Sequence, residues 1–349
     1  MENLIHPKAV DLQILTALST DARASAAEIG KKVNLSATAT KYRVHKIEEK
    51  YGIKYTIQIA QRPFGLFRYA IFVKFINKKP DSAEIKSALG NIPWIQLVAV
   101  TSGEYDLFIY LFAENTHNLE EMVYSIRSDT RLSRYKSYWY VNYITDAYGY
   151  VPLRDKFFEA LKERVWHKTE RSQRRPHGSL LEREFLILKA LNRDGNANFS
   201  ELDKTYGFSE GSSAYTYYKL LESKIIRRAT ITMTKPPIKY NLIVYGVQTD
   251  VFRFNLKRKY YLLDVIKETK TPTNRYILTG DVGSPYGIIR VFPVYDEEEL
   301  IDLENFLKHV KGAIDIQYMQ VKQTIIGEWG YRRIDNTTAV QHQILQNLP

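Results

Sequence analysis

The sequence predicts an α+β protein in which one unit, a winged helix-turn-helix followed by a ferredoxin-like βαββαβ sandwich, occurs twice. Three observations predict this fold: the length of the chain, an internal repeat, and a change of hydrophobic period within each repeat. The chain has 349 residues, which is more than one compact core usually holds and favours two to four domains. The repeat and the periodicity then indicate which domains these are.

The two halves of the chain are similar at a constant offset. Residues 14–21 (ILTALSTD) match residues 187–194 (ILKALNRD). Seven residues after each aspartate comes a glutamate with an aliphatic residue, and seven residues further on comes a hydrophobic residue followed by serine. Near the ends of the two halves, residues 148–150 (YGY) correspond to residues 329–331 (WGY). Because these matches are collinear, we interpret the chain as a tandem duplication.

The first half begins with the pattern of a winged helix-turn-helix. Apolar residues at helical spacing predict the first helix, and Ser25 with Glu28 has the capping-box spacing that begins a second one. Ser36 follows a short turn and is suited to cap a longer third helix. The expected elements are a helix over 10–18, a short helix from 25, a turn at 33–35, a helix over 36–50 and a wing strand over 53–60.

Beyond residue 65 the hydrophobic period changes to that of alternating strands with two helices among them. In the first half we expect a strand over 68–76, a helix over 82–89, strands over 95–101 and 105–112, a helix over 119–127 and a strand over 138–144. In the second half we expect a strand over 243–254, a helix over 260–268, strands over 276–279 and 286–292, a helix over 297–310 and a strand over 314–325. The order βαββαβ is that of the ferredoxin-like sandwich.

These elements divide the chain into six segments. We expect a winged helix-turn-helix at 1–62, a sandwich domain at 63–153, a basic linker at 154–179, a degenerate winged helix-turn-helix at 180–238, a second sandwich domain at 239–335 and a tail at 336–349. The linker begins as an amphipathic helix and becomes basic at 168–175 (KTERSQRR). We interpret it as a helix leading into a flexible joint. Such a basic run is either simply solvated or in contact with DNA phosphates.

The composition favours a nucleic-acid partner. The formal net charge is +11, the pI is near 9.4, and the excess lies mainly in residues 1–175. Such a charge favours polyanions, most often nucleic acid, although a merely basic soluble protein is the alternative. No apolar run reaches the roughly 18 residues that cross a bilayer, and the N-terminus lacks a signal-peptide pattern. The chain has no cysteine, which excludes disulfides, thiolate metal sites and a cysteine nucleophile. We therefore expect a cytoplasmic protein without membrane association.

Residues 11–53 resemble the Lrp/AsnC family of bacterial and archaeal regulators. The residues that carry the resemblance are Asp11, Ile14, Leu15, Leu18, Asp21, Arg23, Ser25, Glu28, Ile29, Val33, Leu35, Ser36, Arg43, Val44, Ile47, Glu48, Gly52 and Ile53. The downstream βαββαβ unit resembles the family's amino-acid-sensing (RAM-type) domain, and residues 101–106 (TSGEYD) are similar to its Gly-x-Tyr-Asp turn. The chain departs from the pattern at Thr40, where the family usually has valine, and by one extra residue before Gly52. The resemblance is strong in the first half and weak in the second. It implies a sequence-specific DNA-binding transcriptional regulator.

The predicted third helix has an inward and an outward face. At about 100° per residue, the inward face that packs on the other helices consists of Thr40, Val44, Ile47 and Tyr51. Arg43 lies on the flank, and we expect it to pair with Glu48 or the preceding helix. The opposite face carries donors suited to phosphates and base edges in the major groove; the alternative is an ordinary solvated helix surface. The residues of the first unit that we expect to contact double-stranded DNA are Lys31, Lys32, Ser36, Thr38, Lys41, Tyr42 and His45.

The corresponding face of the second unit lacks positive charge. At the same offset it consists of Gly211, Ala214, Tyr215 and Tyr218. Glu210 adds a negative charge near the start of the helix. Non-specific affinity comes mostly from phosphate neutralisation, so we expect this face to bind DNA weakly or to serve an interface. Arg227 and Arg228, which enter the second wing, are the remaining candidates for a phosphate contact.

The resemblance also implies an effector site. In the family, paired sandwich domains associate through their sheets, and small effectors such as amino acids bind at that interface. A tandem chain could make this pairing internally, as a pseudo-dimer, and could also pair with a second copy. The candidate effector-binding residues are Thr101, Gly103, Tyr105 and Asp106. The alternative is an ordinary hairpin turn in which Asp106 accepts backbone N–H groups. The corresponding stretch 279–286 is longer and contains a proline, so we expect one site or none per chain.

An enzyme and an adaptor are the alternatives to a regulator. The tandem architecture also resembles the siroheme decarboxylases, which use His and Arg on the sandwich strands to handle the carboxylates of a tetrapyrrole. The seven histidines of this chain lie outside the predicted sandwich strands, and the His-Asn-Tyr signature is absent. The sequence contains no recognisable metal-ligand cluster, nucleophile–base pair or P-loop. We therefore expect no catalytic residue, metal or cofactor. A protein–protein adaptor remains the other alternative, because the second unit is degenerate.

Overall fold

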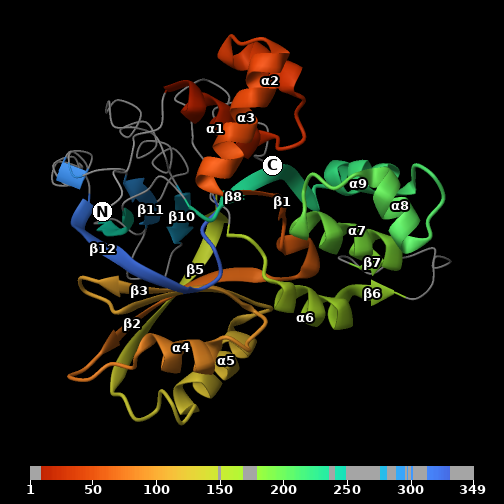
Figure 1. Cartoon of the computed structure of the whole chain (residues 1–349). Coiled ribbons are helices and arrows are strands. Elements are labelled where there is room, and N and C mark those ends of the chain that lie inside the picture. The colour runs from red at the N-terminus through yellow and green to blue at the C-terminus, as the bar shows by residue number, and fades with distance from the viewer. Residues whose placement is uncertain are drawn as a thin grey trace.

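The computed structural model describes residues 9–147, 151–167, 179–235, 240–248, 276–280, 288–294, 297, 300–301 and 313–330. This part of the chain contains two groups of three helices, a closed sheet, three further helices and two small two-stranded sheets (Figure 1). The predicted helix at 260–268, the basic run at 168–175 and the tail at 336–349 lie outside the described residues. Of the predicted helix at 297–310, residues 297, 300 and 301 are described, and they are helical.

The first group of helices has the predicted helix-turn-helix order. It consists of α1 (Ala9–Thr20), α2 (Ala26–Val33) and α3 (Ala37–Tyr51), followed by strand β1 (Ile53–Ile59). The capping box is present: the Ser25 hydroxyl accepts the Glu28 N–H at 3.2 Å, and the Glu28 carboxylate accepts the Ser25 N–H at 2.7 Å. Between α2 and α3, Asn34 adopts the left-handed conformation that ends α2.

The first sandwich domain follows in the predicted βαββαβ order. Its elements are β2 (Phe67–Phe75), α4 (Ser82–Leu89), β3 (Ile95–Ser102), β4 (Leu107–Ala113), α5 (Thr116–Ser128) and β5 (Ser137–Ala147). Both helices cover one face of the sheet (Figure 1), where Ile85 and Leu119 are buried against strand residues such as Ile109. Two predicted bounds are wrong. Strand β4 begins at Leu107 because residues 103–106 form the turn, and α5 begins at Thr116 because Asn115 caps it.

In the second half, three helices again precede the strands. Helices α7 (Glu182–Arg193), α8 (Phe199–Tyr206) and α9 (Ser212–Glu222) precede the strands β8 (Ile226–Met233), β9 (Tyr240–Gln248), β10 (Tyr276–Gly280), β11 (Ile288–Val294) and β12 (Ala313–Ile326). The predicted starts of β9 and β11, residues 243 and 286, are therefore each off by two or three residues. Boundaries are the least reliable part of a pattern-based prediction.

The two sets of sandwich strands form one closed sheet. Its strand order is β10-β11-β9-β12-β3-β4-β2-β5, with β10 pairing back to β5. Each half keeps the same internal order, and the halves join edge to edge through antiparallel β3–β12 and β5–β10 pairs. The closure leaves no free strand edge among the described strands of this sheet. The pairing between sandwich domains thus occurs within one chain.

Strands β1 and β8 form a separate antiparallel ribbon between the two groups of helices. Thr56 of β1 lies opposite Thr230 of β8. Each strand is tied to the first helix of the other half: Thr56 Oγ1 donates to the Asn192 carbonyl at 2.8 Å, and Thr230 Oγ1 donates to the Ser19 carbonyl at 2.8 Å. The predicted wing strands therefore pair with each other, and the two helix groups share one scaffold.

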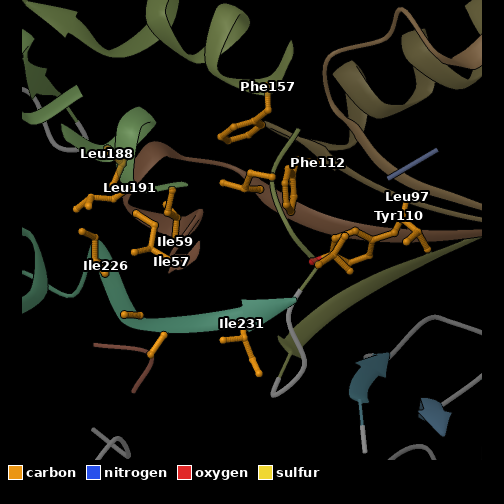
Figure 2. Packing of buried hydrophobic residues seen from close by; sticks show 14 of the residues in the cluster. Ile57, Ile59, Leu97, Tyr110, Phe112, Phe157, Leu188, Leu191, Ile226 and Ile231 are labelled. Atoms are coloured by element: carbon orange, nitrogen blue, oxygen red, sulfur yellow. The ribbon is translucent and has the colours of Figure 1, made fainter. Parts of the chain in front are cut away.

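The predicted linker helix is present and belongs to the core. Helix α6 (Asp155–Val165) leads into β6 (Trp166–His167), which pairs in parallel with β7 (Leu180–Leu181). Phe157, Phe158 and Leu161 of α6 are fully buried, and Figure 2 shows Phe157 above Phe112 of β4. The same core continues to Ile57 of β1 and Ile226 of β8 (Figure 2). No helix in the described ranges is both long and apolar enough to span a membrane.

Candidate nucleic-acid interface

Helix α3 has the inward and outward faces that the sequence predicts. Thr40, Ile47 and Tyr51 are buried, and Val44 is half-buried. The four outward residues, Thr38, Lys41, Tyr42 and His45, are all exposed. The Tyr42 side chain is 65% exposed although it is large and aromatic. An exposed aromatic ring next to a positive charge is suited to contact the phosphates and base edges of a nucleic acid.

The start of α3 is open and positively polarised. Ser36 is the N-cap, its hydroxyl accepts the Ala39 N–H at 3.2 Å, and the first turn of α3 contains no acidic residue. Lys31 and Lys32 are exposed in the last turn of α2, immediately before it. A helix N-terminus with unneutralised N–H groups and nearby lysines is a ready anion site.

Two exposed lysines of α3 are not among the residues that the sequence predicts to contact DNA. Lys46 and Lys50 are exposed on the same helix, and the Lys46 ammonium lies 5.7 Å from the centre of the Tyr42 ring. Tyr42 and Lys46 are four residues apart and so lie on the same side of the helix, and this spacing would have predicted the contact of Lys46 with Tyr42. With Lys31, Lys32 and Lys41 they place five exposed lysines on α2 and α3.

Side chains at the back of α3 hold it in place. Arg43 Nε lies 3.0 Å from the Asp11 carboxylate of α1, so its structural role was expected but both predicted partners are wrong. Glu48 instead accepts the Tyr55 hydroxyl of β1. Burial and this hydrogen bond raise the pKa of Tyr55. His45 faces its neighbour Glu49 at 3.5 Å. Helix α3 is thereby fixed to both the first helix and the ribbon.

The corresponding helix of the second half begins later than its offset predicts. The match of Ser36 to Ser209 places its start near residue 210, whereas α9 begins at Ser212 after Gly211 in a left-handed conformation. Its predicted outward tyrosines are exposed, with Tyr215 at 65% and Tyr218 at 63%. Lys219 pairs with the buried Glu184 of α7 at 2.7 Å. The outward face of α9 is therefore aromatic and uncharged.

The reason for the later start is a carboxylate at the head of α9. Asp203 of α8 accepts the Gly211 N–H at 2.8 Å and the Ser213 N–H at 2.7 Å. At the offset of 173 its counterpart is Gly30, where an added Cβ would lie 2.5 Å from the Leu35 carbonyl oxygen. The tight turn of the first half therefore requires glycine, whereas the wider turn of the second half accommodates Asp203. The first turn of α3 contains no carboxylate, whereas the Asp203 carboxylate accepts two backbone N–H groups at the start of α9.

The Asp203 cap predicts an acid-sensitive contribution to stability. Hydrogen bonds from Ser213 and Gly211 lower the pKa of Asp203 below its ordinary value near 3.8. Its stabilisation is therefore complete above that value and is lost as the pH falls through the lowered pKa. We expect Asp203→Ala to lower the free energy of unfolding by about 1–2 kcal/mol at pH 7. Urea unfolding checks this, with Asp203→Asn as the milder control. An equal loss at pH 7 and pH 2.5 would contradict the role of the charge.

Arg227 and Arg228 lie on β8, where the ribbon approaches the closed sheet. Arg227 is exposed and Arg228 is half-buried. The charge of Arg227 acts on Tyr110 of β4. Arg228 lies opposite Gln58 of β1 in the register of the ribbon. The two arginines therefore face different surroundings from the lysines of α2 and α3.

The turn proposed for an effector is a compact hairpin. Asp106 Oδ2 accepts the Phe75 N–H at 2.9 Å, and Oδ1 lies 3.5 Å from the Lys79 ammonium. Thr101 Oγ1 donates to the Tyr105 carbonyl at 2.7 Å, and Tyr105 is buried. Gly103 has a φ of 116°, and a Cβ there would lie 3.0 Å from the Tyr318 carbonyl of β12. This geometry is that of an ordinary hairpin turn, in which Asp106 accepts a backbone N–H group and pairs with a lysine.

A further tie between the two helix groups was not anticipated. The Arg23 guanidinium donates to the Gly195 carbonyl at 2.7 Å and to the Ala197 carbonyl at 3.2 Å. It also stacks 4.0 Å from the centre of the Phe199 ring. In the sequence, Arg23 is only one of the residues that carry the family resemblance, and its contact with Phe199 of α8 depends on the tertiary arrangement.

The helix-turn-helix defines the class of protein. Residues 9–48 match the model of the AsnC-type helix-turn-helix domain. The HTH-type transcriptional regulator Rv2324 of Mycobacterium tuberculosis is 33% identical over 128 residues, which cover 36% of this chain and 86% of that protein. The HTH-type transcriptional regulator LrpC of Bacillus subtilis is 28% identical over 116 residues, 33% of this chain and 79% of that protein.

Solved structures of a siroheme decarboxylase resemble nearly the whole chain. The crystal structure of the siroheme decarboxylase NirDL has a TM-score of 0.57 at 13% identity and covers 97% of this chain and 98% of that one. At this identity the likeness concerns the fold alone. Of the histidines in the described residues, His45 and His117 lie on helices and His167 lies in the short strand β6. The described residues contain no group of three His, Cys, Asp or Glu side chains that could hold a metal.

The chain belongs to the Lrp/AsnC family of HTH-type transcriptional regulators.

Proposed function

We propose that this protein is an asymmetric tandem regulator that binds double-stranded DNA through its first helix-turn-helix. The observation that carries the proposal is the contrast between α3 and α9. The head of α3 is open and is flanked by lysines, whereas Asp203 caps the head of α9. In this proposal α3 enters the major groove, and α9 contributes little to affinity.

The affinity for DNA comes chiefly from the five exposed lysines of α2 and α3. Each lysine that neutralises a phosphate releases condensed counterions, and this term dominates non-specific binding. Lys31 and Lys32 flank the anion-binding head of α3, and Lys41 lies on its outward face. Thr38, Tyr42 and His45 are placed to contact base edges or sugar. Ser36 positions the backbone N–H groups for a phosphate.

We propose further that the two halves arose by duplication and form an internal pseudo-dimer. Thr56 and Thr230 face each other in the ribbon, and the hydrogen bonds to Asn192 and Ser19 are the same contact made twice. Such reciprocal contacts are typical of an interface about a two-fold axis. The equal strand orders in the two halves of the closed sheet support the same proposal.

Modulation by a small effector, such as an amino acid, is part of this proposal. The turn with Thr101, Gly103, Tyr105 and Asp106 adjoins β12, so it lies where the two halves of the closed sheet meet. An effector here would compete with Lys79 and the Phe75 N–H for Asp106. One site or none per chain is expected.

The proposal is tested by a salt-dependent DNA titration. Fluorescence anisotropy of labelled genomic duplexes, between about 50 and 200 mM salt, gives the slope of log affinity against log salt. With five phosphate contacts we expect a slope of about −4.5. A flat response contradicts the phosphate-neutralising surface and favours the adaptor. A steep response that does not depend on the duplex sequence supports DNA binding and contradicts base-specific recognition by α3.

A further inference from the structure

A short segment after β12 reaches from the closed sheet to the first wing. We call residues 327–330 the strap. The Trp329 ring is stacked on the Phe108 ring of β4, with the ring centroids 6.0 Å apart and the ring planes at 16°. Gly327 has a φ of 76°, and a Cβ there would overlap the Gln96 carbonyl oxygen of β3. One part of the strap is therefore fixed on strands of the first sandwich domain.

Another part of the strap lies on the ribbon. Gly330 forms an antiparallel bridge with Thr232 of β8, and Thr232 lies opposite Lys54 of β1. The Lys54 ammonium donates to Glu328 Oε1 at 2.7 Å, and the Thr232 hydroxyl donates to Glu328 Oε2 at 3.5 Å. The carboxylate of the strap is therefore placed on the lysine of the first wing strand.

This end of the ribbon is joined to α3. The Thr234 N–H and hydroxyl both donate to the Gly52 carbonyl, at 3.0 Å and 3.1 Å. The Lys235 N–H donates to the Tyr51 carbonyl at 3.0 Å. Tyr51 is the last residue of α3, and Gly52 is its C-cap. Figure 1 shows the ribbon between α3 and the closed sheet. Contacts therefore continue from the closed sheet through the strap and the ribbon to α3.

Lys54 extends the exposed lysines of α3 into the wing. It follows the C-cap Gly52 by two residues, and its side chain is 53% exposed. Lys46 and Lys50 precede it on α3. In the proposed DNA complex, a free lysine at this place neutralises a phosphate beside the groove that α3 enters. Glu328 occupies the ammonium of Lys54 instead and adds a negative charge near that surface.

This ion pair is suited to exchange its partners. The side chains of Lys54 and Glu328 are both exposed. Exposed pairs contribute little to stability, so a phosphate can replace the carboxylate. The counterpart of Lys54 at the offset of 173 is Arg227, and the counterpart of Glu328 at the offset of 181 is Ala147. Alanine carries no charge, so the carboxylate is not repeated at the corresponding position of the other half.

We propose that Glu328 is a positioning residue that keeps Lys54 away from DNA phosphates, and that the closed sheet thereby sets the affinity of the first helix-turn-helix for DNA. This inference rests on the proposed binding of double-stranded DNA by α3. While Trp329 holds the strap on the sheet, the carboxylate of the strap holds the ammonium of Lys54. When the strap leaves the wing, Lys54 neutralises a phosphate and one negative charge moves away from the DNA. The affinity for DNA is therefore higher in the released state.

A salt-dependent DNA titration of Glu328→Gln tests the role of the carboxylate. The variant keeps the size of the side chain and removes its charge. We expect about fivefold tighter binding near 0.1 M salt, and a slope of log affinity against log salt that is steeper by about one unit. In a Lys54→Ala background the same substitution is expected to have little effect, because the gain depends on the freed lysine. Glu120→Gln, on the exposed side of α5, is the matched control for charge and is expected to leave the affinity unchanged.

Lysine acetylation of the free full-length protein tests the ion pair without DNA. N-hydroxysuccinimide acetate is the reagent, and peptide mass spectrometry gives the labelling rate of each lysine. Glu328→Gln is expected to raise the labelling rate of Lys54 about threefold, because the ammonium loses its carboxylate partner. The rate of Lys50 is expected to stay the same. Trp329→Leu removes the stacked ring that holds the strap on the sheet, and we expect it to raise the labelling of Lys54 in the same way.

The outcomes separate this inference from the proposed function. An unmodified protein that binds no duplex overturns the proposed function and, with it, this role of Lys54. If the unmodified protein binds DNA, an unchanged affinity in Glu328→Gln, or an equal gain in the Lys54→Ala background, overturns the inference alone. Equal labelling of Lys54 in the unmodified protein and in Glu328→Gln overturns the ion pair. Equal labelling in the unmodified protein and in Trp329→Leu overturns the coupling to the closed sheet.

Discussion

Replacing Lys31, Lys32 and Lys41 together by alanine is expected to weaken binding of double-stranded DNA by about a hundredfold near 0.1 M salt. All three side chains are exposed at the end of α2 and on the outward face of α3. Each phosphate contact contributes about one unit to the slope of log affinity against log salt. The slope is therefore expected to become shallower by about three units. Fluorescence anisotropy measures both quantities on the same duplex.

The control for this variant removes the same charge elsewhere. Lys86, Lys204 and Lys224 are also exposed, and Lys204 is the counterpart of Lys31 at the offset of 173. The triple alanine variant at these positions is expected to retain most of the affinity, because only local phosphate contacts release counterions. If both variants lose affinity equally, net charge and not the surface of α2 and α3 is responsible. Far-UV circular dichroism verifies that both variants are folded.

Phe157→Ala is expected to lower the free energy of unfolding by about 3–5 kcal/mol, a typical cost for truncating a buried phenylalanine. Phe157 is fully buried. Its ring makes edge-to-face contacts with Trp94, Phe112 and Phe158 at centroid distances of 5.9, 5.6 and 5.6 Å. The substitution leaves a cavity and removes these contacts. Urea denaturation followed by circular dichroism measures the effect.

This experiment separates two descriptions of α6. If the helix were only a tether between the halves, Phe157→Ala would change stability by less than about 0.5 kcal/mol, as surface substitutions do. Glu159→Ala on the exposed face of the same helix is the matched control and is expected to stay within that limit. Similar values for the two variants would contradict the placement of α6 in the core.

Much of the first half was predictable because local signals agreed with the fold. Ser25 with Glu28 and Ser36 determine where α2 and α3 begin, and both caps are present. The inward positions Thr40, Ile47 and Tyr51 follow from helical spacing alone. Such agreement between capping, periodicity and packing is what makes a pattern reliable. The exposure of the outward residues follows directly, although their contact with DNA stays a prediction.

Other features depended on partners distant in sequence. Arg43 pairs with Asp11, and Arg23 reaches Gly195 on the far side of the ribbon. Neither partner is visible from spacing, because salt bridges and carbonyl contacts between elements depend on how those elements pack. The constant offset between the two halves also predicts the wrong start for α9. This helix begins later than the match of Ser36 to Ser209 predicts, because Asp203 caps it.

The sequence by itself determined the order of the elements, the ends of α2 and α3, and the distribution of charge that favours the first unit. These properties are local: each depends on a few neighbouring residues and their period. Only the tertiary structure decided that β1 pairs with β8, that the two sets of sandwich strands close into one sheet, and that α6 is core. The same holds for Arg68, whose burial beside Gln61 no spacing predicts. Burial and strand pairing are properties of contacts between distant segments, and the free energy that selects them is gained only when the whole core assembles.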